Sequence, residues 1–452
     1  MTNDAMRRCS IFRGLLVCFI CGCCSAIANS QVAIKSDSQS NPALLTLPAA
    51  LHFALENNLA LAAQRQQLGI ASARIIIADT YPFNPVLENR ILASSGPSSA
   101  GITNRVPVEH LLLWEVEVRN QRHFRREGAA ATFSRTEWEI AFQEQTLSVE
   151  VIRAFTNVLY RQEKLLNLEE TLRINERFVD DIRRLVNLGK LRSADLIQAP
   201  TEVTVSLDLV ATGRESLAAA RQDLNRVLGA VAGNYLAEGV LLSTPWKWES
   251  DALLELAIVR RADLKARQMA VSEASANVKL TTANRYGNPS VGAIYTYDPS
   301  RISSVGVQIN IPLPIVNKRR GEIGQSEAER MLALAQLHNA EFDVKQQVTA
   351  ALARLVAAER RAEQFRIKGL PDLRRAVDDM EKLFQAGESG VDLQRVIDVR
   401  RKLLQARDSY LDALWSVRQA RIDVIAATGE PALELEKPTS TPAPATTNRV
   451  RP

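Results

Sequence analysis

The residues with the most reactive side chains are cysteines, and all five of them lie within the first 24 residues: Cys9, Cys18, Cys21, Cys23 and Cys24. Cysteines placed in this way cannot form disulfides across the rest of the chain. Thiol chemistry is therefore not expected in the body of the protein, whichever way its N-terminus is processed.

The cysteines fall in a stretch that resembles a secretion signal. Arg7, Arg8 and Arg13 accompany the apolar run 14–24, and the small-x-small pattern Ala26-Ile27-Ala28 follows it. This order predicts a signal peptide over residues 1–28, with an apolar core too short to span a bilayer as a helix. Alternatively, Ile20-Cys21-Gly22-Cys23 resembles the lipobox of bacterial lipoproteins, although Cys21 is unusual at its second position. Cleavage would then precede Cys23, which would carry the lipid.

Residue types that support catalysis or metal binding are not spaced as a catalytic site or a metal site requires. His52, His110, His123 and His338 are isolated from one another and from other ligands, and the five methionines form no thioether ladder. The carboxylate pairs Asp180-Asp181 and Asp378-Asp379 would point in different directions on a helix, so a solvated face explains them better than a site. No phosphate loop or nucleophile motif is visible. We expect neither an enzyme nor a cofactor.

Charge also excludes one class of partner. The 56 Lys and Arg residues are spread among 51 Asp and Glu residues, which leaves a net charge of +5 and no long run of either sign. Nucleic acid is therefore not an expected partner.

Very long helices dominate the chain. Residues 129–188 contain no glycine or proline over 60 residues, which as one helix would extend for roughly 90 Å. Apolar residues recur there with three-four spacing, which predicts coiled-coil packing along most of this length. These heptad positions are Leu147, Val151, Ala154, Val158, Leu165, Leu168, Leu172, Val179, Ile182 and Val186.

The chain repeats one order of elements. Residues 45–232 and 250–430 each begin with a helix of about thirty residues, predicted at 48–78 and 251–284. Two strands, a long helix, a glycine turn and a return helix follow in each half. Pro200 and Gly213 are expected to interrupt the first return helix, and Gly369-Leu370-Pro371 the second outgoing helix. Residues 233–249 link the halves, and the Pro/Thr-rich residues 431–452 are expected to be disordered.

Four short segments alternate in polarity as strands do: 86–93, 108–118, 290–297 and 303–311. In the last of them Val305, Val307, Ile309 and Ile311 share one face, which we expect to meet lipid, with Gln308 and Asn310 toward a lumen. Four strands cannot close a barrel, but twelve strands from three chains can. Aromatic residues near the strands fit an interfacial girdle, whereas a soluble hairpin on helices would explain the strands alone. They are Tyr81, Phe83, Trp114, Tyr286, Tyr295 and Tyr297.

Several motifs follow one another in the same order in both halves of the chain. They are 47–63, the Asn-Pro pairs at 84 and 288, the stretch 309–314 with Asn317 and Gly321, the turns at Gly189 and Gly387, and Thr428-Gly429. In the order of these motifs, the chain over about 45–430 resembles the TolC-like outer-membrane efflux proteins, closest to their CzcC/CusC-type heavy-metal branch.

This resemblance implies a mainly α-helical homotrimer. Its helices would form a hollow coiled-coil α-barrel through the periplasm, and its strands a twelve-stranded barrel among the lipids of the outer membrane. The implied partners are a periplasmic adaptor and an inner-membrane pump of the RND type or another type, and the protein itself would be a passive exit duct.

The resemblance also implies two kinds of site. The adaptor-facing tips would be Leu188, Gly189, Lys190 and Leu191 with Ala386, Gly387, Glu388 and Ser389. Acidic residues near such tips often narrow the pore, and Asp195, Asp392 and Asp398 are the candidates here. Each of these carboxylates is equally interpreted as a solvated or capping group. A periplasmic coiled-coil adaptor or structural protein is the alternative function, although adaptors usually carry one helical hairpin rather than two.

Overall fold

The computed structural model describes residues 43–93, 106–189, 195–229, 235–239, 241, 250–298, 302–386 and 392–431. The expected signal peptide with Cys23, most of the linker 233–249 and nearly all of the tail 431–452 lie outside these ranges. The chain divides into two units, of which one comprises 1–43 with 233–236. The other comprises Leu44–Ala232 and Ala237–Pro452, and its elements are described below.

Four strands form one antiparallel sheet in the order β2-β3-β5-β6. They are β2 Val86–Ile91, β3 Val108–Glu115, β5 Ser290–Tyr297 and β6 Ser303–Asn310, so all four predicted strands are present and three of them end earlier than expected. Strands from the two halves meet where β3 pairs with β5, with Leu112 opposite Ala293. Two short strands, β1 Ala43–Thr46 and β4 Tyr235–Glu238, were not predicted.

The first helix of each half is broken, so the prediction of two uninterrupted helices was wrong. The first is divided into α1 Leu47–Asn57, α2 Leu59–Arg65 and α3 Gln67–Asp79. The second is divided into α6 Ser250–Arg260 and α7 Ala262–Ala283, followed by the 3₁₀ turn η2 Asn284–Tyr286. Asn58 and Arg261 have extended backbones, with ψ of 115° and 120°. Each therefore ends one helix and begins the next.

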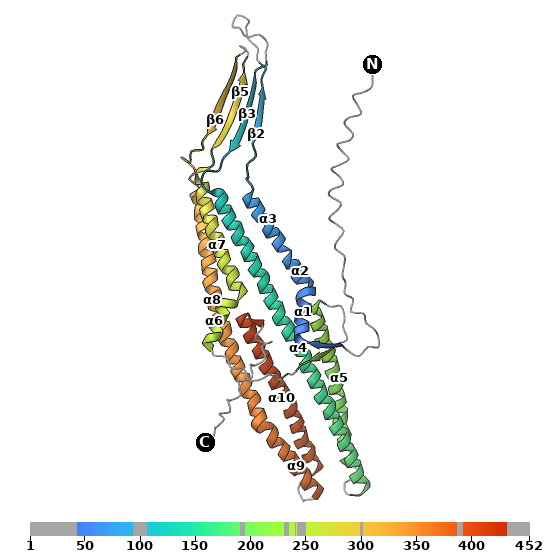
Figure 1. The fold of residues 1–452 in the computed structure, drawn as a ribbon. Coiled ribbons are helices and arrows are strands. Elements are labelled where there is room, and N and C mark those ends of the chain that lie inside the picture. Colours follow the sequence, from blue (N-terminus) through green and yellow to red (C-terminus); the bar gives the residue numbers. More distant parts are fainter. Residues whose placement is uncertain are drawn as a thin grey trace, which may run out of the picture. The chain divides into compact units, whose positions relative to one another are not determined.

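Helix α4, Gln121–Asn187, is the longest described element at 67 residues and continues through Gly128. The heptad prediction is confirmed: Leu147, Val151, Val158, Val179 and Ile182 are buried, and the other predicted positions are half-buried. Helix α4 packs along α5 and α7 and also meets α3 and α10 (Figure 1).

The expected interruption of the first return helix was wrong, because α5 runs unbroken from Asp195 to Leu228. Pro200 lies near its N-terminus, so a single backbone hydrogen bond is lost there. Gly213 lies on the face toward α4, where an added Cβ would be 3.0 Å from Leu168 Cδ1 and 3.3 Å from Leu165 Cδ1. Glycine thus allows the two helices to approach closely.

The second long helix changes its winding instead of stopping. Helix α8 Arg320–Gln364 passes through a π-helical turn, η3 Phe365–Gly369, into α9 Leu370–Ala386. A π turn accommodates Pro371, which has no backbone N–H to donate. The return helix α10 covers Leu393–Thr428 and packs on α8, α9 and α4.

Within this unit the sheet lies at one end of the helices, and the ends of α4 and α9 lie at the other (Figure 1). The buried core is made largely of Ala, Val, Leu and Ile from helix faces. None of the described helices is long and apolar enough to cross a membrane.

Candidate functional site

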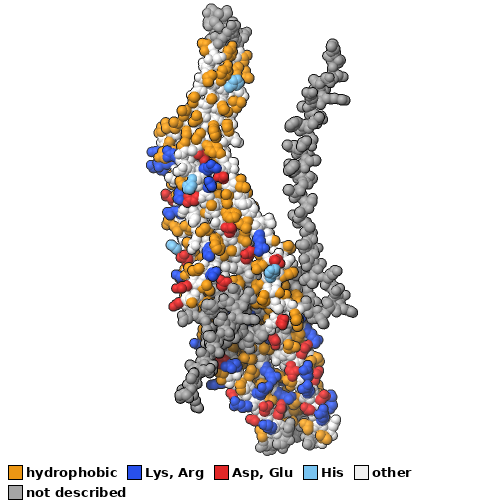
Figure 2. All heavy atoms as spheres, viewed as in Figure 1, with side chains coloured by type: hydrophobic (Ala, Val, Ile, Leu, Met, Phe, Trp, Pro, Cys, Tyr) orange, Lys and Arg blue, Asp and Glu red, His pale blue; other side chains and the backbone are white. Residues whose placement is uncertain are grey.

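The sheet has one apolar and one polar face, and the apolar face is open. The alternation of β6 exposes 83% of Val305, 75% of Val307 and 61% of Ile309 on one side. Residues paired across β3 and β5 continue this face with Leu112, Ala293 and Val291. Figure 2 shows hydrophobic side chains over this end of the molecule. The predicted division of β6 between an apolar and a polar side is therefore confirmed.

All the charged side chains of the four strands lie on the opposite face: Glu88, Arg90, Glu109 and Glu115. Arg90 pairs across the strands with Glu109 at 3.1 Å. Gln308 donates to Asn310 at 3.2 Å on the same side. This face can therefore line an aqueous space.

Aromatic residues mark both ends of the apolar face. Next to the helices, the Tyr81 ring packs edge-on against Trp114, with centroids 5.7 Å apart. The Tyr81 hydroxyl donates to the Glu115 carbonyl at 2.7 Å and accepts from the Glu117 N–H at 2.9 Å. At the far end, Tyr295 stacks on His110, whose Nδ1 is 2.6 Å from Asn89 Oδ1. Amphipathic rings at two levels are typical of a lipid-facing strand surface.

The predicted tips are described in part. Gly189 ends α4 in the left-handed region with φ of 71°, and nothing lies within 4 Å of a Cβ placed there. Leu188 beside it is 70% exposed. Ala386 is the last residue of α9. The remaining predicted tip residues lie outside the described ranges: Lys190, Leu191, Gly387, Glu388 and Ser389.

The candidate constriction residues have local partners in the described chain. Asp392 caps α10 by accepting a hydrogen bond from the Arg395 N–H at 3.0 Å. Asp398 accepts from Gln394 Nε2 at 3.2 Å and lies 3.9 Å from Arg401 Nη1. Asp195 begins α5, and its side chain is not described. Within one chain, Asp392 and Asp398 are not hydrogen-bonded to each other.

A polar cluster that the sequence did not reveal joins α4 to α10. Lys164 Nζ lies 2.9 Å from Asp412 Oδ1 and 3.3 Å from Asp408 Oδ2. The Tyr160 hydroxyl donates to Asp412, and the Tyr160 ring stacks on Trp415 at 4.8 Å between centroids. The spacing of Tyr160 and Lys164 on one helix face, matched by Asp408 and Asp412 on another, was the available signal.

The pKa shifts in this cluster favour the charged forms of Lys164 and Asp412. Burial alone would lower the pKa of Lys164, but its hydrogen bonds with Asp412 and Tyr160 raise it overall. Burial alone would raise the pKa of Asp412, whereas hydrogen bonds from Tyr160 and Lys164 lower it overall. Burial and the Asp412 carboxylate raise the pKa of Tyr160. The cluster is therefore a charged link at neutral pH.

A cavity of about 400 Å³ lies next to this link, between α4, α5 and α10. Lys164 and Asp408 line it, as do Arg400 and the buried pair Asn175 and Ser206, whose side chains are 2.8 Å apart. Arg401 of α10 pairs with Glu202 of α5 across the same space. Charged contacts thus join the two helical hairpins where apolar packing is incomplete.

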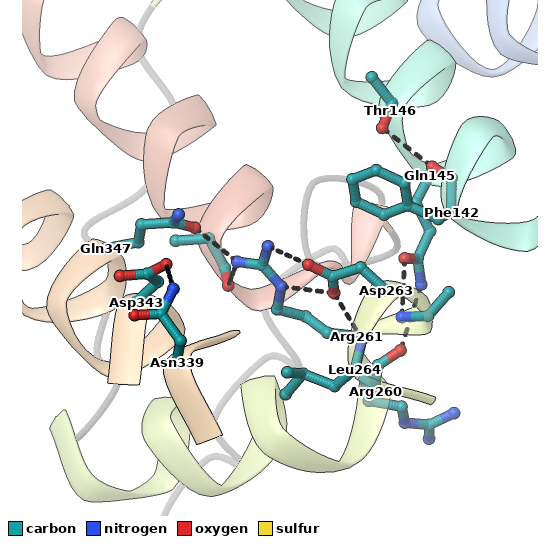
Figure 3. Close-up of polar contacts among 12 residues, drawn as sticks. Phe142, Gln145, Thr146, Arg260, Arg261, Asp263, Leu264, Asn339, Asp343 and Gln347 are labelled. Atoms are coloured by element: carbon teal, nitrogen blue, oxygen red, sulfur yellow. Dashed lines mark hydrogen bonds and ion pairs between the residues drawn. The ribbon is translucent and has the colours of Figure 1, made fainter. Parts of the chain in front are cut away.

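A second polar node surrounds the break at Arg261 (Figure 3). The buried Arg261 guanidinium donates to both oxygens of Asp263, to Gln347 at 2.7 Å and to the Ala427 carbonyl at 3.1 Å. Gln145 of α4 contacts the same break through the Arg260 carbonyl and the Ala262 N–H. The node therefore joins α4, α8 and α10 to the start of α7.

Potential metal ligands are dispersed in the part of the chain that the structure describes. No group of three or more His, Cys, Asp or Glu there is placed to hold a metal ion. His52 faces Glu56 at 3.3 Å on an exposed helix surface, and His123 packs on Phe124.

A four-stranded sheet with one open apolar face, continued into paired helical hairpins, is the fold of the TolC-like outer-membrane channels. Comparisons with known proteins agree. Residues 253–430 match the family model described as outer membrane efflux protein. The chain is also 26% identical, over 70% of its length and 75% of the relative, to the cobalt-zinc-cadmium resistance protein CzcC of Cupriavidus metallidurans.

Solved structures of the same fold include CusC, with a TM-score of 0.69 and 18% identity over 84% of this chain and 91% of CusC. The CmeC outer membrane channel of Campylobacter jejuni has a TM-score of 0.67 and 13% identity over 85% of each chain. The resemblance to TolC-like efflux proteins of the heavy-metal branch is thereby confirmed. The family model and CmeC are described as outer-membrane proteins, and this chain has their fold.

Proposed function

We propose that three copies of this chain form the exit duct of a tripartite efflux system. The observation that carries the proposal is the sheet β2-β3-β5-β6, whose outer strands β2 and β6 each pair on one side only within the described chain. Open edges beside an exposed apolar face favour closure with further strands. Three such sheets supply twelve antiparallel strands, an even number suited to an outer-membrane barrel.

In this arrangement the face with Val305, Val307 and Ile309 meets lipid, and Arg90 and Glu109 lie toward the lumen. The helices of three chains surround a continuous aqueous path in the periplasm. Two hairpins per chain, α4 with α5 and α9 with α10, contribute to that wall.

The two halves, 45–232 and 250–430, are proposed to be tandem repeats. Asn120 before α4 and Arg319 before α8 are the non-glycine residues with positive φ in the described chain, at 58° and 48°. They occupy the same place in each half, directly before the long helix. Gly229 and Gly429 likewise follow the two return helices, with φ of 76° and 71°.

A periplasmic adaptor is proposed to dock at the tips, where Leu188 and Gly189 are exposed. An inner-membrane pump would supply the energy, and the duct would conduct passively. Because the related CzcC is named for resistance to cobalt, zinc and cadmium, we propose heavy-metal cations as the cargo. The acidic residues Asp195, Asp392 and Asp398 would then favour cations near the narrow end.

Fractionation and electrophysiology test this function. Heat-resistant trimers in the outer-membrane fraction and single-channel conductance in planar bilayers are expected. A soluble periplasmic monomer without conductance would instead favour the coiled-coil adaptor class. Growth of a deletion strain on cobalt, zinc, cadmium and unrelated drugs tests the cargo: sensitivity to the metals alone is expected, and sensitivity to drugs alone would exclude it.

A further inference from the structure

The segment 311–320, which runs from the end of β6 to the first residue of α8, combines exposed apolar residues with unpaired cations. Ile311 is 65% exposed, Leu313 71%, Ile315 73% and Val316 96%. Lys318, Arg319 and Arg320 follow directly and are also exposed. Apolar side chains followed by lysine and arginine are typical of a segment at a membrane surface.

These three cations have no carboxylate partner within the described chain. Their side chains form no ion pair or hydrogen bond there, and the backbone N–H of Arg319 donates to Asn317 Oδ1 at 2.9 Å. Figure 2 shows basic side chains gathered where the sheet joins the helices. An exposed group of like charges without internal partners attracts anions.

In the first half, by contrast, the arginines around the start of α4 have partners within the chain. Arg125, near the start of α4, pairs with Glu117, with Nη2 and Oε2 3.0 Å apart. Arg122 lies 3.0 Å from Asp79, and the Arg119 guanidinium lies 3.8 Å from the centre of the Tyr286 ring. The first half therefore satisfies its arginines internally.

The two halves also differ in charge at one matching position. Glu117 lies three residues before Asn120, and Val316 lies three residues before Arg319, at the same place relative to the two positive-φ residues. A carboxylate in the first half is thus replaced by an almost fully exposed valine in the second. Loss of the charge together with gain of an apolar side chain favours a partner with an apolar body and an anionic head.

We propose that residues 311–320 bind anionic glycerophospholipids in the leaflet that faces the periplasm. Ile311, Leu313, Ile315 and Val316 enter the acyl region, and Lys318, Arg319 and Arg320 contact headgroup phosphates. The segment continues directly from the apolar face of β6, so lipid that covers Ile309 also reaches Ile311. This inference rests on the proposed function, which sets the sheet in the membrane and the helices in the periplasm.

Native mass spectrometry of the purified full-length trimer tests the inference. The protein is mixed with phosphatidylglycerol and phosphatidylcholine of equal acyl chains, and the ratio of retained lipids is measured. The wild type is expected to prefer phosphatidylglycerol. In the triple variant Lys318→Gln, Arg319→Gln, Arg320→Gln, the ratio of retained phosphatidylglycerol to phosphatidylcholine should fall about tenfold. Each basic residue near a membrane surface adds to the attraction of anionic lipid.

A matched control removes the same charge far from the sheet. Arg374→Gln, Arg375→Gln, Lys382→Gln alters exposed residues of α9 and should leave the lipid ratio unchanged. Val316→Glu, which places a carboxylate at the position of Glu117 in the first half, should also lower the preference, but by less than the triple variant, since one carboxylate offsets one of the three cations.

Several outcomes would overturn the inference. An equal lipid ratio in the wild type and the triple variant would exclude headgroup binding. Loss of heat-resistant trimers in the triple variant would assign the cations to a neighbouring copy, and displacement of phosphatidylglycerol by equimolar inorganic phosphate would assign them to free phosphate. A conducting wild-type trimer without lipid preference refutes only this inference, whereas a wild type that forms no trimer and does not conduct refutes the proposed function.

Discussion

Lys164 of α4 and Asp412 of α10 form an ion pair with 2.9 Å between Nζ and Oδ1, and they join helices from opposite halves of the chain. Tyr160, stacked on Trp415, donates a hydrogen bond to the same carboxylate. Lys164 is 22% exposed and Asp412 43%. A partly buried pair with a hydrogen-bonded third member stabilises more than a solvated surface pair does.

Replacing Lys164 by methionine is expected to destabilise the protein. The variant keeps most of the side-chain volume but leaves Asp412 with a weaker set of partners, so the free energy of unfolding should fall by about 1–2 kcal/mol. Thermal unfolding followed by circular dichroism measures this. Arg173→Gln is the control, because its pair with Glu170 is exposed and should contribute less than about 0.5 kcal/mol. If both variants lost the same free energy of unfolding, the cluster would contribute no more than an exposed surface pair.

The same link predicts how stability depends on pH. The pKa of Asp412 is lowered in the folded protein, so its contribution is present above the ordinary aspartate value and is lost as pH falls through the folded value. The pKa of Lys164 is raised, so its contribution is complete below the ordinary lysine value and is lost as pH rises through the folded one.

Stability from this link should therefore be greatest between about pH 5 and 9. Melting temperatures of the wild type and Asp412→Asn, measured from pH 3 to 11, check the expectation. The difference between the two proteins should shrink at low pH, where the wild-type carboxylate becomes protonated. A difference that stays constant down to pH 3 would show that charge on Asp412 contributes little.

The sequence predicted the strands and α4 well because their signals are local. Alternating residues define β5 from Ser290 to Tyr297, and three-four spacing defines the buried face of α4. By contrast, Pro200 and Gly213 are helix breakers by propensity, yet α5 continues through both. Tertiary packing against α4 outweighs a propensity cost of a few kcal/mol.

The helix breaks at Asn58 and Arg261 could not be predicted because their partners are distant in the sequence. Asn58 Nδ2 donates to the Val227 carbonyl at 3.0 Å, and Arg261 Nη1 donates to the Ala427 carbonyl at 3.1 Å. Each partner lies near the end of a return helix. The cluster of Tyr160, Lys164 and Asp412 could not be predicted for the same reason, since a local pattern does not show which charged helix faces contact each other.

Filling Gly213 should separate α4 from α5. Gly213→Val places side-chain atoms where even a Cβ would lie 3.0 Å from Leu168 Cδ1, and overpacking of this kind costs about 1–3 kcal/mol. Gly69→Ala is the matched control in α3, because nothing lies within 4 Å of its added Cβ. That change should stabilise by about 0.5–1 kcal/mol. Denaturant melts of both variants measure the contrast, and a neutral Gly213→Val would exclude close packing at this point.

A bulky residue at Gly189 is expected to weaken adaptor docking while the trimer remains. Gly189→Val introduces strain of about 1–2 kcal/mol at a left-handed turn, but the surrounding space is open, so the effect should stay at the tip. Metal sensitivity of a complemented deletion strain reports docking, and heat-resistant trimers on gels report assembly. Wild-type resistance in this variant would count against the assignment of the tip.

Replacing Asp392 by asparagine distinguishes a role as a helix cap from a role in the pore. Asparagine preserves the cap but removes the negative charge. Asp392 accepts a hydrogen bond from the Arg395 N–H at 3.0 Å, and asparagine caps helices about as well as aspartate does. If three copies of this carboxylate narrow the duct, Asp392→Asn should reduce cation selectivity in planar bilayers while the melting temperature stays unchanged. Asp392→Ala should raise conductance as well, because it removes both charge and bulk, and should lose about 1 kcal/mol of stability with the cap. Reversal potentials in a salt gradient distinguish the two roles: if selectivity and conductance are unaltered in both variants, Asp392 acts as a helix cap alone.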